Sequence, residues 1–188
     1  MRIRIDKIPE HGMSLAFEEN PETFPVLGKI ARDGGCEFIS PILFRLRAIR
    51  VRELVEVEGK FKTTVRLSCS RCLEEFETSL QSRISLSYTQ EAPEVFGTAS
   101  EEDIELTAQD IGLILFHGKE IDLTKGLQEH VVMSIPFKPL CSETCKGLCP
   151  GCGMDLNKSE CRCDRSSTHN AFAALKDFKI LKPDKSRS

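Results

Sequence analysis

The stretch that decides the fold runs from Phe61 to Tyr88 and reads FKTTVRLSCSRCLEEFETSLQSRISLSY. Mostly apolar side chains occupy every second position from Phe61 to Leu67, and again from Phe76 to Tyr88. A period of two residues is that of a β-strand, whose successive side chains point to opposite faces of a sheet. We therefore predict two strands, each with one apolar and one polar face, joined by the turn that contains Cys69 and Cys72.

The same alternation begins upstream and extends the predicted sheet. Between Ile42 and Val57, apolar residues alternate with arginine or glutamate. Glu58-Gly59-Lys60 is typical of a turn, because glycine accepts a positive φ at little steric cost. The alternation changes phase at Ala48-Ile49-Arg50, which predicts a β-bulge or a change of strand. We predict a meander of about four antiparallel strands between Ile42 and Tyr88.

The region after the sheet predicts short strands and a helix. Residues 104–123 hold two short apolar runs on either side of the turn His117-Gly118-Lys119. Asp122 can cap a helix at about 122–135 through its carboxylate, and Pro136 ends that helix. Its apolar residues recur at the i, i+4 spacing of one helix face and should cover the sheet: Leu123, Leu127, Val131 and Ile135.

Together these elements predict an α+β fold: mainly an antiparallel β meander with one or two covering helices and a cysteine-rich, zinc-ribbon-like C-terminal segment. Residues 1–137 would form the β-rich domain, including an acidic loop at 90–110 that holds seven acids and no base. Residues 138–188 would form the cysteine-rich segment and a short final helix that begins at Thr168 or Asn170.

Composition excludes several classes of protein. With 40% hydrophobic residues among 188, the chain has the apolar surface that a disordered protein lacks. The N-terminal residues 1–7 are too charged for a secretory signal, so we expect a cytoplasmic protein. The longest apolar run, 111–116, is far shorter than a membrane span, so we expect no membrane association.

Cysteine is the most informative residue type in this chain. There are nine, and six of them lie between Cys141 and Cys163. Cytosolic thiols are kept reduced, so short regular spacings favour metal ligation over disulfides. Cys69-Ser-Arg-Cys72 and Cys149-Pro-Gly-Cys152 have the spacing of metal knuckles, tight turns that aim two thiolates at one point.

Eight of the cysteines make two tetrahedral sites of four thiolates each, with Cys36 left over as a bystander. The simplest grouping puts Cys149, Cys152, Cys161 and Cys163 in one site, because only eight residues separate these two pairs. Cys69 and Cys72 would then join Cys141 and Cys145, which would fasten the C-terminal segment to the sheet. A closed set of thiolates indicates two structural Zn²⁺ ions; spacing alone leaves an iron–sulfur cluster open.

The order of these motifs resembles the YceD-type large ribosomal RNA subunit accumulation proteins. The resemblance rests on Leu67-Ser-Cys-Ser-Arg-Cys-Leu-Glu-Glu-Phe76, on the stretch from Pro139 to Asn157, and on Cys161-Arg-Cys163. It implies a bacterial or organellar ribosome-biogenesis factor that supports synthesis, processing or stability of 23S rRNA and is not an enzyme. The implied partners are large-subunit rRNA, a large-subunit ribosomal protein or a precursor particle, with no small-molecule substrate.

The charge pattern is compatible with contact to RNA. The polar face of the predicted sheet displays basic residues that could meet phosphates, and the first knuckle adds one more: Arg45, Arg47, Lys60, Lys62, Arg66 and Arg71. The chain has no Trp and one Tyr, so recognition of the RNA backbone or shape is favoured over base stacking.

Two other functions remain open at the level of sequence. The chain could be a zinc-ribbon adaptor that binds a protein partner without touching RNA. A nuclease or a thiol oxidoreductase is less favoured, because no paired catalytic carboxylates or Ser-His-Asp arrangement stands out. A thioredoxin-like Cys-x-x-Cys should also follow a parallel strand, whereas the strands around Cys69 are predicted to be antiparallel.

Overall fold

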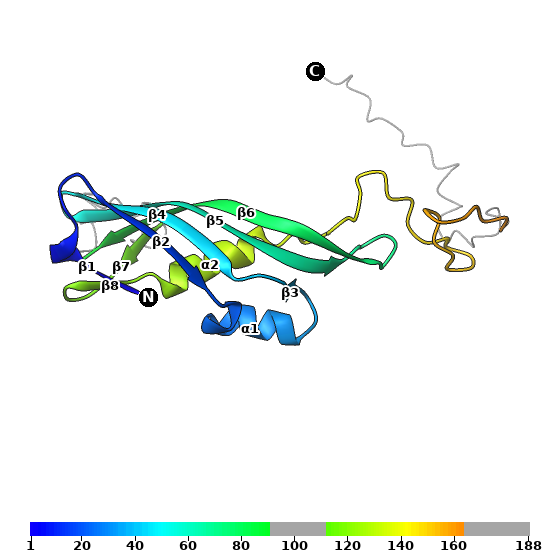
Figure 1. The fold of residues 1–188 in the computed structure, drawn as a ribbon, viewed down its shortest axis with the longest axis horizontal. Helices are drawn as coiled ribbons and strands as arrows, with labels where there is room; N and C mark the ends of the chain where they lie inside the picture. The colour runs from blue at the N-terminus through cyan, green and yellow to red at the C-terminus, as the bar shows by residue number, and fades with distance from the viewer. Residues whose placement is uncertain (91–111, 164–188) are drawn as a thin grey trace, which may run out of the picture.

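The computed structural model describes residues 1–90 and 112–163 and is dominated by one twisted sheet (Figure 1). Four strands run antiparallel in the order β2-β4-β5-β6, and β7 adds to β6 in parallel. Their bounds are Met13–Glu19 (β2), Ile42–Val51 (β4), Leu54–Ser68 (β5), Glu75–Thr89 (β6) and Leu113–Leu115 (β7). The two-residue β3, Glu37–Phe38, pairs with β5, and a separate small sheet joins β1, Arg2–Arg4, to β8, Glu120–Asp122.

The predicted turn at Glu58-Gly59-Lys60 is wrong, because β5 runs through it without a break. A Cβ atom at Gly59 would lie 2.1 Å from the carbonyl oxygen of Arg45 on the neighbouring strand. Glycine is needed here for the close approach of two backbones and not for a positive φ. Three long strands, not about four, therefore occupy the stretch from Ile42 to Tyr88.

The predicted bulge near Ala48 is absent as well. Strands β4 and β5 pair in unbroken register from Leu43↔Lys62 to Val51↔Leu54, and the chain turns at Arg52, whose φ is 56°. Since side chains alternate along β4, Arg50 lies on the opposite face of the sheet from Arg45 and Arg47.

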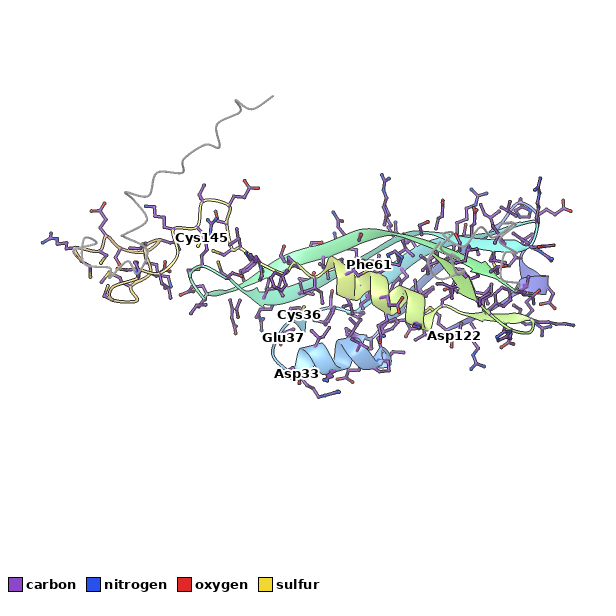
Figure 2. All side chains as sticks on the ribbon, turned by 180° about the vertical axis from the view of Figure 1, so that it is seen from behind. Asp33, Cys36, Glu37, Phe61, Asp122 and Cys145 are labelled. Atoms are coloured by element: carbon purple, nitrogen blue, oxygen red, sulfur yellow. The ribbon has the colours of Figure 1, made fainter. Side chains whose placement is uncertain are left out.

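The core lies on the inner face of the sheet, between its strands and two helices, α1 (Pro25–Arg32) and α2 (Thr124–Ser134). Figure 2 shows Phe61 in the middle of the sheet and Cys145 beyond its end. Helix α2 lies within the predicted range, and Leu123, Leu127 and Val131 are fully buried as predicted. The N-cap residue of α2 is Leu123 and not Asp122, but the carboxylate of Asp122 accepts a hydrogen bond of 2.9 Å from the backbone N–H of Thr124, the first residue of the helix.

Several elements near the N-terminus were not predicted. Helix α1 begins at Pro25, a residue suited to the first helical position because it lacks an N–H. Phe24 and Leu27 are completely buried and fix this helix on the core. The acidic loop beyond Gln90 and the final helix at Thr168 or Asn170 lie outside the described residues. Within the described part of the chain, no helix is long and apolar enough to cross a membrane.

Candidate metal centres

Eight cysteines gather into two groups of four, and within each group all the sulfurs lie within 4.8 Å of one another. We call Cys69, Cys72, Cys141 and Cys145 the first cluster, and Cys149, Cys152, Cys161 and Cys163 the second cluster. This grouping matches the one predicted from spacing along the chain. Cys36 lies apart from both, buried in the main core, and burial raises the pKa of its thiol to about 11.

The two clusters begin with the same local turn, formed by Cys69–Leu73 in the first and Cys149–Gly153 in the second. The backbone N–H of Arg71 donates to the sulfur of Cys69 at 3.5 Å, and that of Gly151 donates to the sulfur of Cys149 at 3.4 Å. Leu73 N–H donates to the carbonyl of Cys69, as Gly153 N–H does to that of Cys149. The N–H groups of Arg71 and Gly151, which donate to sulfur, stabilise negative charge on the thiolate and fix its direction.

The spacing of the sulfurs fits a single metal ion. A zinc ion bound at about 2.3 Å by four tetrahedral sulfurs keeps those sulfurs about 3.8 Å apart, whereas a disulfide brings two sulfurs to about 2.05 Å. The sulfurs of Cys69 and Cys145 are 3.8 Å apart, and those of Cys72 and Cys141 are 3.7 Å apart. In the second cluster, the sulfur of Cys161 lies closer to its neighbours, 3.5 Å from that of Cys152 and 3.3 Å from that of Cys149. All nine cysteines are free thiols.

The hydrogen bonds within each cluster favour one thiolate in particular. Backbone N–H groups of Cys141 and Cys72 lower the pKa of Cys69 to about 6. The backbone N–H of Cys152 and the thiol of Cys161 likewise lower the pKa of Cys149 to about 6. Both knuckles therefore hold a cysteine that releases its proton readily. The resulting thiolate is the form of cysteine that binds a metal.

Three of the four cysteines of the first cluster are enclosed by protein. Cys69, Cys72 and Cys145 are at most 5% exposed, while Cys141 is exposed. Phe76, Leu140 and Leu148 pack against it. These apolar neighbours keep water away from the three buried cysteines and strengthen electrostatic interactions there.

Arg71 organises the segment that carries the later cysteines. Its guanidinium donates to the carbonyl oxygens of Glu143 at 3.2 Å and Cys145 at 2.9 Å. Its own carbonyl accepts the backbone N–H of Leu148 at 3.1 Å. Gly147, with a φ of 74°, passes so close to this knuckle that a Cβ there would lie 3.0 Å from the carbonyl oxygen of Arg71. The side chain predicted to meet RNA is thus occupied within the metal centre.

Asn157 lies in the chain segment of the second cluster but contacts the first cluster, and it was not singled out from the sequence. Its side-chain amide donates to the sulfur of Cys145 at 3.3 Å and to the carboxylate of Asp155 at 2.8 Å. Its side-chain oxygen accepts the backbone N–H of Lys146 at 2.8 Å. A residue between Cys152 and Cys161 thereby contacts a sulfur of the first cluster. No spacing rule marks such an asparagine, because its partner is set by the fold.

The other predicted RNA-contact residues have different surroundings. Arg66 donates to the carboxylates of Glu37 and Glu77 at 2.8 and 2.7 Å, so its charge is compensated. Arg47 donates to the carbonyl oxygen of His11 at 2.8 Å. The remaining three, Arg45, Lys60 and Lys62, line one groove on the outer face of the sheet.

Arg83 belongs to the same groove and was not among the predicted contacts. It lies directly opposite Lys60 in the pairing of β5 with β6. The sequence placed Arg83 on the polar face of its strand, but only the register shows that it stands beside Lys60. A register is set by the turns and the packing of the whole sheet.

Comparison with known proteins gives a consistent set of matches. A family model described as "Large ribosomal RNA subunit accumulation protein YceD" matches residues 57–179. The chain is 28% identical over 153 residues to "Large ribosomal RNA subunit accumulation protein YCED homolog 1, chloroplastic" of Arabidopsis thaliana, covering 72% of this chain and 48% of that protein. The maize protein of the same description is 27% identical over 148 residues, with 69% and 50% covered.

A bacterial relative extends this set. An uncharacterized protein of Mycobacterium leprae is 30% identical over 138 residues, covering 72% of this chain and 58% of that protein. The chain spans about half the length of the curated plant relatives it matches. No solved structure matches it.

Proposed function

Because the chain belongs to the YceD family of large ribosomal RNA subunit accumulation proteins, we propose that it supports the accumulation of 23S rRNA as a non-catalytic, zinc-stabilised assembly factor. The matched residues, 57–179, include all eight clustered cysteines and most of strands β5 and β6. We place its action in the cytoplasm, on rRNA or on a precursor of the large subunit.

The observation that carries the structural role is the closed donor set of each cluster. Four thiols converge in each, so a bound metal would have no open position for substrate or water. Zn²⁺ suits such a set because it prefers tetrahedral sulfur ligands. An iron–sulfur cluster places several irons between the sulfurs and needs them farther apart than they lie here. When bound, the metal cross-links the four cysteines of its cluster.

Metal analysis tests the zinc assignment and the absence of thiol chemistry together. Two zinc ions per purified chain, with eight cysteines protected from alkylation until a chelator is added, are expected. Iron in place of zinc would overturn the metal assignment. One disulfide that forms and is reduced in each cycle would support a thiol oxidoreductase instead.

Depletion of the protein in its own cells tests the function. The ratio of 23S to 16S rRNA should fall, and precursors of the large subunit should accumulate in sucrose gradients. Restoring the normal chain should recover the ratio. Unchanged rRNA and subunit profiles after depletion would refute the proposal.

One observation favours an adaptor that binds a protein partner. Met133 near the end of α2 is 84% exposed, and Phe137, just beyond it, is 95% exposed. Large apolar side chains this exposed, and this close in the chain, can mark an interaction surface. An adaptor would lose its function in the double variant Met133→Ser/Phe137→Ser and would give no enriched rRNA sites after crosslinking. The assembly factor that we propose should be crosslinked to rRNA in cells.

A further inference from the structure

Four cations form a band across the outer face of the sheet. Lys60 of β5 stands opposite Arg45 of β4 on one side and opposite Arg83 of β6 on the other. Lys62 follows two residues later on the same face. With strands about 4.8 Å apart, the row of three spans about 10 Å, and Lys62 lies about 7 Å from Lys60 along the strand.

This arrangement of cations lowers the stability of the sheet when no anionic ligand is bound. Like charges directly opposite each other on neighbouring strands are destabilising, and here two such pairs share Lys60. Among residues 1–90 and 112–163, none of the four cations forms an ion pair, although Arg66 on the same face has two. A row of uncompensated cations is what an anionic ligand would neutralise.

The band lies in a cavity of about 690 Å³, lined by the four cations and by Leu43, Phe61, Gln81 and Ser82; of these, Phe61 is only 1% exposed. Acidic residues bound it along the strands: Glu58 precedes Lys60 on one side, and Glu77 follows the band on the other. The positive strip is therefore narrow: it spans about 10 Å across the strands and about 7 Å along them. A narrow strip favours a linear polyanion over a broad acidic surface.

The surroundings also indicate which part of a nucleic acid would bind. The outward-facing positions of β4, β5 and β6 hold no aromatic residue, so bases have no ring to stack on. Double-stranded RNA is bound mainly through its shape and its phosphates, whereas proteins that hold single strands rely on stacking. The chemistry of this face suits the phosphate backbone of a duplex.

We infer that Arg45, Lys60, Lys62 and Arg83 together bind the phosphate backbone of double-helical RNA that lies across β4, β5 and β6. This inference rests on the proposed function and names the surface and the form of RNA that it uses. Arg83 joins the site through the strand register, while Arg66 and Arg71 are left out because the protein itself occupies them.

Fluorescence anisotropy with a labelled 20-base-pair RNA duplex tests this surface. The double variant Lys60→Gln/Arg83→Gln should weaken binding by about tenfold or more. It would contact fewer phosphates, so its binding would release fewer counterions from the RNA. The slope of log K against log salt should become shallower by about 2, one for each cation removed. A single-stranded 20-mer should bind more weakly than the duplex.

The matched control removes two exposed cations from the helices on the other side, Lys29→Gln/Lys125→Gln. This control has the same net charge as Lys60→Gln/Arg83→Gln. It should retain the RNA affinity and the salt slope of the unaltered chain. Equal losses in both double variants, an unchanged slope, or tighter binding of the single strand would overturn the inference. Thermal melting should show that neither double variant is unfolded, since the four substituted side chains, Lys29, Lys60, Arg83 and Lys125, are all exposed.

The outcome is separable from that of the proposed function. If depletion lowers 23S rRNA but the duplex binds both double variants equally, the cation band is wrong and the function stands. If the duplex responds as expected but depletion leaves 23S rRNA unchanged, the function is wrong. Co-sedimentation with precursor particles that survives Lys60→Gln/Arg83→Gln would indicate a protein contact in place of RNA.

Discussion

The two cysteine clusters start from the same turn and end in different surroundings. Both knuckles make the same backbone hydrogen bonds, and both lower the pKa of their first cysteine to about 6. Yet three cysteines of the first cluster are buried, whereas in the second only Cys149 is. Local sequence therefore sets where the sulfurs point, and the rest of the fold decides how much structure depends on them.

The clusters also differ in how much chain they enclose. Cys72 and Cys141 in the first cluster are 69 residues apart, whereas Cys152 and Cys161 in the second are 9 apart. In a loop-closure estimate this difference amounts to about 2 kcal/mol. The first cluster should thus stabilise the protein as a whole, and the second only its own short segment.

The largest effect is expected from Cys69→Ser. It removes a buried ligand from the first cluster and should lower the free energy of unfolding by on the order of 4 kcal/mol, with the loss of one zinc ion. Cys161→Ser should also lose one zinc ion but leave the melting of the sheet nearly unchanged. Differential scanning calorimetry and metal analysis of both variants measure this. Equal melting losses would mean that the clusters do not differ as described.

A smaller effect is expected from Asn157→Ala, which removes the amide that donates to the sulfur of Cys145. Loss of such a partner typically lowers metal affinity by about 10- to 100-fold, so a chelator should remove the first metal faster. Asn157→Asp is the matched variant, because it keeps an acceptor for Lys146 and loses the donor. Normal metal release from Asn157→Asp would show that the donor has no role.

Gly147→Ala should cost about 2 kcal/mol, because an added Cβ would meet Arg71 and the backbone φ of 74° disfavours alanine. Gly118→Ala provides the control. Its φ is 79°, but no atom lies within 4 Å of the added Cβ, so about 1 kcal/mol is expected from the backbone alone. Chemical denaturation compares the two. Similar losses would show that the contact with Arg71 is unimportant.

The smallest effect concerns the residue that ends each knuckle. Leu73 adopts a φ of 63° and is 66% exposed, where the second knuckle has Gly153 with a φ of 74°. Leu73→Gly should be more stable than Leu73→Ala by about 1 kcal/mol, since only glycine adopts this conformation without strain. Thermal melting of the two variants tests this. A Leu73→Ala variant as stable as Leu73→Gly would count against strain at this position.

The sequence predicted those features that depend on local spacing. The alternation in β6, the hydrogen bond from Thr124 to Asp122 at the start of α2 and the grouping of the cysteines all follow from residues close in the chain or from pairs of fixed spacing. Gly59 was misread as a turn because its reason, the backbone of Arg45, lies on another strand. Asn157 and Arg83 were missed for the same cause: each acts through a neighbour that only the assembled fold supplies.

The unbroken course of β5 has a consequence for any partner of this protein. The strand passes from the cation band to Ser68, the residue before Cys69, without a bulge, and the seven steps along the chain from Lys62 to Cys69 cover about 23 Å. A paired strand in the middle of a sheet does not stretch or fold back. The separation between the cation band and the first cluster is therefore fixed by β5 and cannot adjust to a partner.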